Sequence, residues 1–487
     1  MAEKLKLNYK KTILIGFGFM AASVAWAIYD PYITKILDAL LSNAPLINTW
    51  SAALIERFPR LLDFMATQLS AEELAASGGF TLAPLFIGVI MTFDNIFGVI
   101  FQPAFGKLSD RTHSRRGKRS PFIYIGAPIS ALLFALIPVM FLSFNSVPAV
   151  MPFIILFVFV MSLWRAPVVA LMPDLTPPEL RSEGNAVINL CGGLGGLIGM
   201  VAGSVIMAVM GLSAEEEFKS FPYVFLLGSV IMVACTLVLY FKVKEPDSRL
   251  KAVAEINEAL DAEARRKAQK EAEKEEKERL KKIKLSKGER VSLVFMLTGL
   301  FFLFCATNAI TTFFALFAAE VLGKSTAQAT MMMAIFAVCM MAAAIPAGKI
   351  GKKLGRKKTI LFGLLIFMAV FILYYITKNM ALIWAALVLG GAANMLITVN
   401  TLPLVLEIGG LDKVGTFTGY YYTATFSAQI AAPILFGMYR MLSGTYMSLF
   451  VYVPVMFVFA LLCLLFVKHG EAIPQEVVDE AQLENAD

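Results

Sequence analysis

The chain has 487 residues, of which 58% are hydrophobic and only 16% are charged. A soluble domain of this size has too little interior to bury so much apolar surface, so the composition excludes a soluble protein and predicts one that faces lipid. The formal net charge is +7, but Lys and Arg lie in short links between apolar runs, which argues against a nucleic-acid partner.

The N-terminus allows two interpretations. Lys4, Lys6, Lys10 and Lys11 precede an apolar run that ends near residues 25–27, and this imitates a signal peptide with its cleavage site. The same pattern describes the first spanning helix of a chain that continues with many more, and we favour that interpretation.

Apolar runs of about 20 residues, long enough to cross a bilayer as a helix, recur along the chain. The predicted spans are 12–34, 84–105, 121–142, 149–171, 185–211, 221–243, 291–317, 327–349, 359–377, 380–404, 415–438 and 445–467. We therefore expect an all-α membrane protein with about twelve transmembrane helices.

Basic links predict the orientation and a duplication. Lys and Arg gather after the second and eighth predicted spans, at Lys107, Arg111, Arg115, Arg116, Lys118 and Arg119, and at Lys349, Lys352, Lys353, Arg356, Lys357 and Lys358. Because positive links remain in the cytoplasm, we expect both termini there. Gly-Lys-Leu at 106–108 and Gly-Lys-Ile at 348–350 open the two links, which predicts two related six-helix bundles with a substrate path between them.

The predicted organisation is a first bundle over 1–243, a second over 291–467 and a cytoplasmic tail over 468–487. Residues 35–83 form an extracytoplasmic insert, expected as one or two short helices on the membrane surface or over the mouth. Residues 244–290 mix Lys, Glu, Ala and Arg, so we expect a solvated helix or tether between the halves, with a regulatory role as the alternative.

The segment 106–119 is the most specific motif. Its glycines permit close helix approach, and Asp110 beside several cations predicts a cytoplasmic salt-bridge lock that opens when the halves rock. The alternative is that positive charge serves only as a topology signal. Asp174, after the fourth span, either joins this network or is simply solvated. The candidate gate residues are Gly106, Asp110, Arg111, Arg116, Gly117, Arg119 and Asp174.

Residues 106–122, GKLSDRTHSRRGKRSPF, resemble the expanded link between helices 2 and 3 of the glycoside–pentoside–hexuronide cation symporters, within the major facilitator superfamily. Residues 92–95 (TFDN), 164–175 (WRAPVVALMPDL) and 415–422 (GTFTGYYY) resemble more closely the branch of plant sucrose transporters and their bacterial relatives. The resemblance covers the chain except the 35–83 insert and the central tether.

This resemblance implies the major facilitator fold and proton-coupled uptake of a small glycoside, such as the disaccharides sucrose or maltose. Melibiose-type relatives carry sodium-binding carboxylates near the cytoplasmic part of helix 2. This sequence has Gly98 and Gln102 there, so sodium is a less expected partner than the proton. A monomer is the family's usual state.

Asp94 and Arg165 are the candidate coupling residues. A carboxylate in the middle of a span costs about 2.5–3.5 kcal/mol on insertion scales, so Asp94 is expected to face a cavity and carry a proton. Arg165 lies on the fourth span at a depth that differs by only about 7–8 Å, and it either pairs with Asp94 or binds sugar hydroxyls. A static ion pair between the two helices is the alternative.

Sugar sites combine flat apolar faces with amide, hydroxyl and charged groups. We expect about half of the amide and aromatic candidates to line the cavity, because membrane amides also join helices and aromatic residues also anchor span ends. The candidates are Trp26, Tyr29, Asn95, Trp164, Asn308, Asn394, Asn400, Tyr421, Tyr422 and Gln429.

An enzyme is not expected, because no compact set of His, Asp or Ser groups and no nucleotide-binding signature is present. Five scattered cysteines and two histidines also give no metal-like spacing, so we expect no metal and no cofactor. The favoured function is glycoside import with protons across the cell membrane by alternating access. Export or facilitated diffusion of another small polar solute, and sodium-coupled glycoside symport, remain alternatives.

Overall fold

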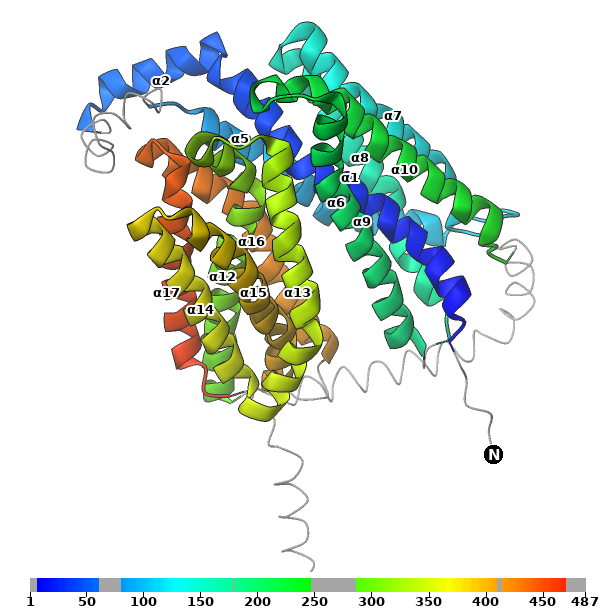
Figure 1. Cartoon of the computed structure of the whole chain (residues 1–487). Helices are drawn as coiled ribbons and strands as arrows, with labels where there is room; N and C mark the ends of the chain where they lie inside the picture. Colours follow the sequence, from blue (N-terminus) through cyan, green and yellow to red (C-terminus); the bar gives the residue numbers. More distant parts are fainter. Residues whose placement is uncertain (1–6, 61–79, 178–179, 247–285, 410–413, 470–487) are drawn as a thin grey trace, which may run out of the picture. The chain divides into compact units, whose positions relative to one another are not determined.

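The computed structural model describes residues 7–60, 80–177, 180–246, 286–409 and 414–469. Within these ranges every regular element is a helix (Figure 1). The helices are α1 (Tyr9–Ser42), α2 (Pro45–Arg57), α5 (Ala83–Met91), α6 (Phe93–Asp110), α7 (Ser120–Phe144), α8 (Val147–Leu175), α9 (Arg181–Met210), η2 (Ala214–Ser220), α10 (Phe221–Lys242), α12 (Lys287–Leu322), α13 (Thr326–Leu354), α14 (Arg356–Thr377), α15 (Met380–Gly409), α16 (Val414–Ser443), η4 (Tyr446–Ser448) and α17 (Leu449–Phe466).

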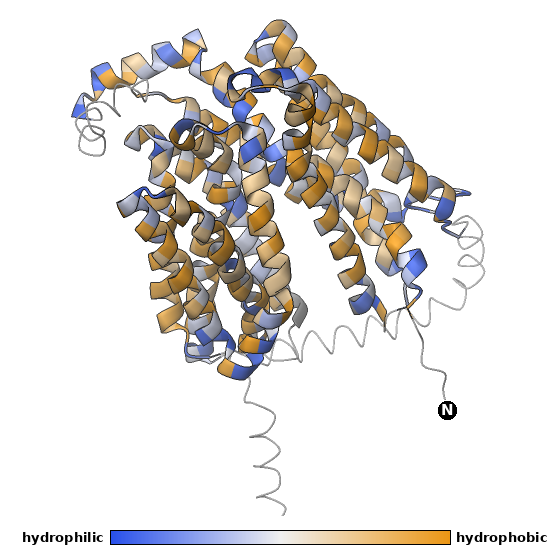
Figure 2. Ribbon diagram, viewed as in Figure 1, coloured by the Kyte–Doolittle hydropathy of each residue, from blue (hydrophilic) through white to orange (hydrophobic). Residues whose placement is uncertain are grey.

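The expected all-helical membrane fold is confirmed. Among the described residues, 11 helical segments are long and apolar enough to cross a membrane. Figure 2 shows that hydrophobic residues cover most of each long helix, while hydrophilic residues gather in links and at helix ends. The predicted span 415–438 forms most of α16, which has 30 residues but is not among the 11, because its first half is rich in Gly, Thr and Tyr.

Local sequence signals mark where several helices begin and end. The side chain of Asn8 accepts a hydrogen bond from the Lys11 N–H at 3.0 Å and so caps α1. Proline stands in the first turn of α5, α7, α8 and α10, where its missing N–H removes no helical bond. Gly211 ends α9 with a φ of 64°, a left-handed conformation that favours glycine.

Helix α1 is longer than the predicted span. It continues through Pro31 to Ser42, and the Thr34 hydroxyl donates to the Asp30 carbonyl at 2.8 Å, close to the proline. Lys35 and Asp38 therefore lie on a continuous helix. Of the rest of the 35–83 segment, α2 is described and bends away from α1 (Figure 1), while residues 61–79 lie outside the described part.

The described residues divide into two units. The first takes its members from 1–265, 311–334 and 433–446, and the second from 266–310, 335–432 and 447–487. In the first unit α1 packs against α5, α8, α9 and α10, and α8 packs against α6 and α7. In the second unit α14 packs against α15 and α17, and an ion pair joins Arg356 to Glu407.

In the first unit, α5 and the last part of α16 cross with their backbones in close approach. A Cβ at Gly88 would overlap the carbonyl of Pro433, and a Cβ at Gly437 would overlap that of Pro84. Each helix thus places a glycine against a proline carbonyl of the other. Glycine has no side chain, and this lets the two helix backbones come so close.

Candidate functional site

A break between α5 and α6 positions the first candidate coupling residue. Thr92 separates the two helices and its hydroxyl donates to the Gly88 carbonyl at 2.9 Å. Asp94 follows in the first turn of α6, where one carboxylate oxygen accepts from the Asn95 N–H at 2.6 Å and from the Asn95 amide at 2.8 Å. Asn95 therefore holds the Asp94 carboxylate in place.

Three charged groups share this region. Arg165 on α8, Asp94 on α6 and Asp30 on α1 interact electrostatically with one another. Among the described residues, however, no direct ion pair joins Arg165 to either carboxylate. Two carboxylates near one guanidinium leave an excess of negative charge that a proton can neutralise.

An aromatic cluster borders these charges. The ring of Tyr29 stacks on Phe157 at 5.3 Å between centroids and meets Trp26 edge-on at 5.2 Å. The Arg165 guanidinium lies 5.7 Å from the Trp26 ring, within cation–π range. The Trp26 indole N–H is buried and has no hydrogen-bond partner in the described part of the chain, so a donor is left over.

A cavity of about 130 Å³ opens beside Trp26 and Asp30. Its walls are Trp26, Ala27, Asp30, Pro31, Met200, Thr311, Phe314, Ala315, Ala329, Thr330 and Met333, all in the first unit. Ligand pockets commonly measure about 300–1,000 Å³, so this cavity suits a few waters better than a disaccharide.

Trp164 lies outside this group although it precedes Arg165. It is 0% exposed, and its indole N–H donates to the Ser130 hydroxyl at 3.0 Å. A Cβ at Gly126 would meet its side chain at 2.8 Å. This packing leaves Trp164 no polar group for a sugar in this structure.

The three predicted asparagines of the second unit point their amide nitrogens at neighbouring groups. Asn308 donates to the Phe304 carbonyl at 2.7 Å, and Asn400 donates to the Leu396 and Ala347 carbonyls at 2.8 and 3.2 Å. The Asn394 amide lies 3.4 Å from the Met340 sulfur. Asn394 and Asn400 thus connect α15 to α13, whereas this contact of Asn308 lies within α12, and a part in substrate binding remains a prediction for all three.

The aromatic candidates of α16 differ in exposure. Tyr421 is 8% exposed, and its hydroxyl lies 3.4 Å from that of Thr401. Tyr422 is 47% exposed and its ring meets that of Tyr421 at 5.5 Å. Gln429, further along α16, is partly buried.

Arg119 is the centre of a charge network in the link between α6 and α7. Its guanidinium donates to Asp174 at 2.9 Å, to the Gly106 carbonyl at 3.3 Å, and also to Asp110 and Ser109. The Lys118 ammonium lies 3.3 Å from Asp174 and 3.8 Å from Asp110. The structure thus brings Asp110, Arg119 and Asp174 together with the Gly106 carbonyl, although a Cβ at Gly106 would meet nothing within 4 Å, and their action as a lock remains a prediction.

Glu245, just beyond α10, completes this network and was not predicted. Its carboxylate accepts the backbone N–H of Ser120 at 2.9 Å and of Arg119 at 3.0 Å, so it caps α7. Burial raises the pKa of the Glu245 carboxyl. Gly117 approaches Glu245 with a φ of 95°.

The other two gate candidates lie apart from this network. Arg116 stacks on the ring of Tyr240 at 4.0 Å. Arg111 is exposed at the end of α6.

Sequence reasoning also missed Asp30. The carboxylate stands in the first predicted span, directly before Pro31 and close to Trp26 and Tyr29, and its position inside an apolar run was the available signal. Because a charged side chain in a membrane span costs free energy, such a residue is a candidate functional residue.

The sequence profile of the Major Facilitator Superfamily matches residues 12–433 and, in a second match, residues 296–483. No curated protein is similar enough to the chain to count as a match. Solved structures match this chain over nearly their whole length. Their sequence identities are low, so the likeness shows the fold alone.

Three of these structures illustrate the likeness. A bacterial homologue of the human lysosomal transporter Spinster, inward-facing and occupied, is 12% identical, with 95% of this chain and 97% of that chain covered and a TM-score of 0.61. The inward-open xylose transporter XylE from E. coli is 16% identical, with 95% and 96% covered and a TM-score of 0.61. The nucleoside transporter NupG is 12% identical, with 93% and 100% covered and a TM-score of 0.59.

Proposed function

Because the chain belongs to the major facilitator superfamily, we propose that it imports a small glycoside together with protons, as a secondary transporter. Family membership and the apolar helices make it a multi-pass membrane transporter and not an enzyme. Its membership of the sucrose-transporter-like branch, its place in the cell membrane and its two six-helix halves joined by 244–290 are parts of the same proposal.

One observation carries the proposal: in the described part of the chain two carboxylates, Asp94 and Asp30, share the cation Arg165 beside the aromatic cluster of Trp26, Tyr29 and Phe157. Such a group can bind a proton, because a proton removes the excess negative charge. The adjoining rings offer the flat apolar faces that sugars stack on, and the spare Trp26 N–H can donate to a hydroxyl.

In the proposed cycle the solute and a proton enter together, and the proton removes the one excess negative charge of Asp30, Asp94 and Arg165. The Arg119 network with Asp110, Asp174 and Glu245 then acts as the lock at the cytoplasmic end. It must break to let that end open and re-form to close it. The likeness to XylE and NupG, which by name carry xylose and nucleosides, supports a small polar solute on this fold.

The experiment is uptake of labelled sucrose and maltose into proteoliposomes, with proton and sodium gradients imposed separately. We expect accumulation driven by an inward proton gradient and not by sodium. Uptake that only equilibrates would favour a facilitator, and uptake driven by sodium alone would favour sodium symport. If neither gradient drives uptake of either sugar, glycoside symport is wrong.

A further inference from the structure

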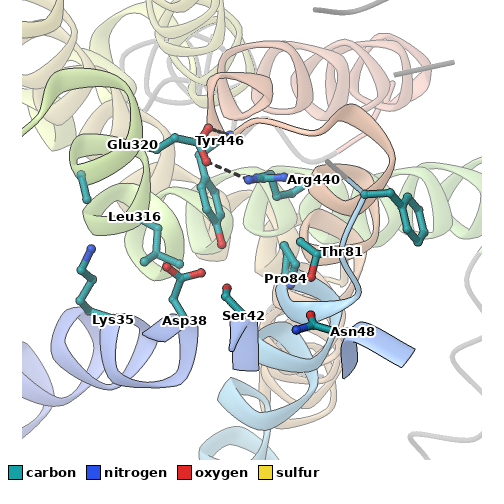
Figure 3. A pocket seen from close by; sticks show the side chains of 12 residues that line it. Lys35, Asp38, Ser42, Asn48, Thr81, Pro84, Leu316, Glu320, Arg440 and Tyr446 are labelled. Carbon is teal, nitrogen blue, oxygen red and sulfur yellow. Dashed lines mark hydrogen bonds and ion pairs between the residues drawn. The ribbon is translucent and has the colours of Figure 1, made fainter. Parts of the chain in front are cut away.

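A second cavity, of about 400 Å³, lies in the first unit at the end of α1 that carries α2. Figure 3 shows the 12 side chains that line it, and all of them belong to this unit. They are Lys35, Asp38, Ser42, Asn48, Phe80, Thr81, Pro84, Leu316, Ala319, Glu320, Arg440 and Tyr446. The cavity is distinct from the smaller one beside Trp26 and Asp30, with which it shares no residue.

One wall is built around Glu320. Its carboxylate accepts from the Arg440 guanidinium at 2.8 Å, and from the Thr445 hydroxyl and the Tyr446 N–H, each at 2.6 Å. The Arg440 guanidinium also lies 4.5 Å from the centre of the Tyr446 ring. These contacts hold the side chains of Glu320 and Arg440 in place, so this wall is formed before any solute binds.

The same wall contains buried polar atoms without hydrogen-bond partners in the described part of the chain. Arg440 is only 5% exposed and Tyr446 only 3%. Within the described chain, the Nε and Nη1 of Arg440 and the hydroxyl of Tyr446 have no hydrogen-bond partner. Buried polar groups are normally satisfied, so three unsatisfied ones at a single cavity point to a ligand or water that supplies the missing bonds.

The opposite wall supplies acceptors and further hydroxyls. Asp38 lies on α1, near enough to Lys35 and Arg440 to interact electrostatically with both. Figure 3 shows the side chains of Asp38, Ser42 and Tyr446 directed into the same space. The Lys35 ammonium lies 3.6 Å from Glu217, a residue outside the lining that also accepts the Thr326 N–H at 2.6 Å.

The charges of the lining cancel, since Lys35 and Arg440 are matched by Asp38 and Glu320. An ion would therefore gain little net attraction here. A neutral solute with many hydroxyls fits better, because each hydroxyl both donates and accepts and can bond to a guanidinium on one side and a carboxylate on the other. The volume lies within the range of small-molecule sites.

We infer that this cavity is a vestibule site that binds a neutral, poly-hydroxylated solute of the transported class before it reaches the central charges. The identity of the solute in this inference rests on the proposed function. The existence of the site does not. Asp38 and Arg440 bind hydroxyls from opposite walls, and the Tyr446 ring and Leu316 provide the apolar contacts.

The test measures binding of labelled sucrose to the purified full-length protein in nanodiscs. In the variant Asp94→Asn with Arg165→Ala, which disables the central group, we expect sucrose binding to persist. Adding Ser42→Trp fills the cavity and should weaken that binding by about tenfold or more. The matched control is Asn43→Trp. Asn43 is the exposed residue next to Ser42 and does not line the cavity, so this substitution should leave sucrose binding unchanged.

Asp38→Asn is the second variant, because it removes the charge without changing the volume and keeps the test informative if Ser42→Trp fails to fold. Asp38→Asn should also weaken sucrose binding. In the central variant without it, the charged sugars glucosamine and glucuronate should compete with labelled sucrose less well than maltose does. The inference is wrong if the central variant binds no sucrose, or if neither Ser42→Trp nor Asp38→Asn alters its binding.

The two proposals fail separately. Gradient-driven sucrose uptake by the wild type, without residual binding in the central variant, rejects only the vestibule. Residual binding that Ser42→Trp abolishes, without any gradient-driven uptake, rejects proton symport and keeps the site.

Discussion

Asp94 combines a fixed position with a shared charge partner. It is held by two hydrogen bonds from Asn95, and it shares the cation Arg165 with Asp30. A static interhelical ion pair would need no second carboxylate. The arrangement instead lets the protonation of one carboxylate change the field at the other two groups.

We predict that Asp94→Asn abolishes accumulation driven by a proton gradient while sugar counterflow continues, because counterflow requires no net proton movement. Loss of at least about tenfold in the accumulation ratio is expected when a coupling carboxylate cannot ionise. Uptake and counterflow in the same proteoliposomes measure this. Glu216→Gln removes an exposed carboxylate paired with Lys219 and is the control. Full accumulation by Asp94→Asn would contradict the assignment.

Glu245 gives a prediction about pH and stability. Because burial raises the pKa of Glu245, the folded protein keeps this proton at a pH where the unfolded chain has lost it. The stability from this group is therefore present at low pH and falls as the pH rises above the ordinary glutamate range. Glu245→Gln imitates the protonated form and can still cap α7.

The melting temperature of Glu245→Gln relative to the wild type should consequently increase as the pH rises from about 4 to about 7. Thermal unfolding of the purified protein across this range measures the difference. Lys244→Gln, at an exposed neighbouring position, should show no such trend. A constant difference between Glu245→Gln and the wild type would refute the prediction.

Among the elements, the crossing of α5 and α16 is the most demanding. We predict that Gly88→Ala lowers the stability of the protein by about 1–3 kcal/mol, since its Cβ would overlap the Pro433 carbonyl and backbone cannot yield as a side chain can. Gly196→Ala, which meets nothing within 4 Å, is the matched control and should be neutral or slightly stabilising. Thermal unfolding of both variants compares them, and equal melting temperatures would contradict the packing.

The elements were largely predictable because lipid requires long apolar helices. The spans could be predicted from run length alone, and the charge network of Asp110 and Arg119 from the density of charge in one link. Less predictable was the end of α1, because Lys35 and Asp38 suggested the start of a polar insert. They remain helical since Lys35 pairs with Glu217 and Asp38 faces a polar cavity.

Site residues were less predictable than elements for a physical reason. An asparagine in a span bonds either to a substrate or to a neighbouring carbonyl, and nothing local in the sequence separates Asn95, which holds Asp94, from Asn400, which bonds to Leu396. Glu245 and Glu320 were missed because their partners are distant in the chain.

At the scale of the whole molecule, the orientation in the membrane can be tested directly. In a variant without the five native cysteines, we expect Asn43→Cys to react with a membrane-impermeant maleimide on intact cells. Arg115→Cys, in the basic link, should react only after the cells are permeabilised. The reverse pattern would place the termini outside.

The make-up of the first unit has a consequence for biosynthesis. Residues 311–334 and 433–446 belong to this unit although all of its other members precede residue 266. Chains insert into the membrane from the N-terminus onward, so Pro84 and Gly88 on α5 lack their contacts with Pro433 and Gly437 until that part of α16 has been translated. A ribosome that stalls before residue 433 would release an intermediate that lacks this contact, and such an intermediate is a natural substrate for quality control in the membrane.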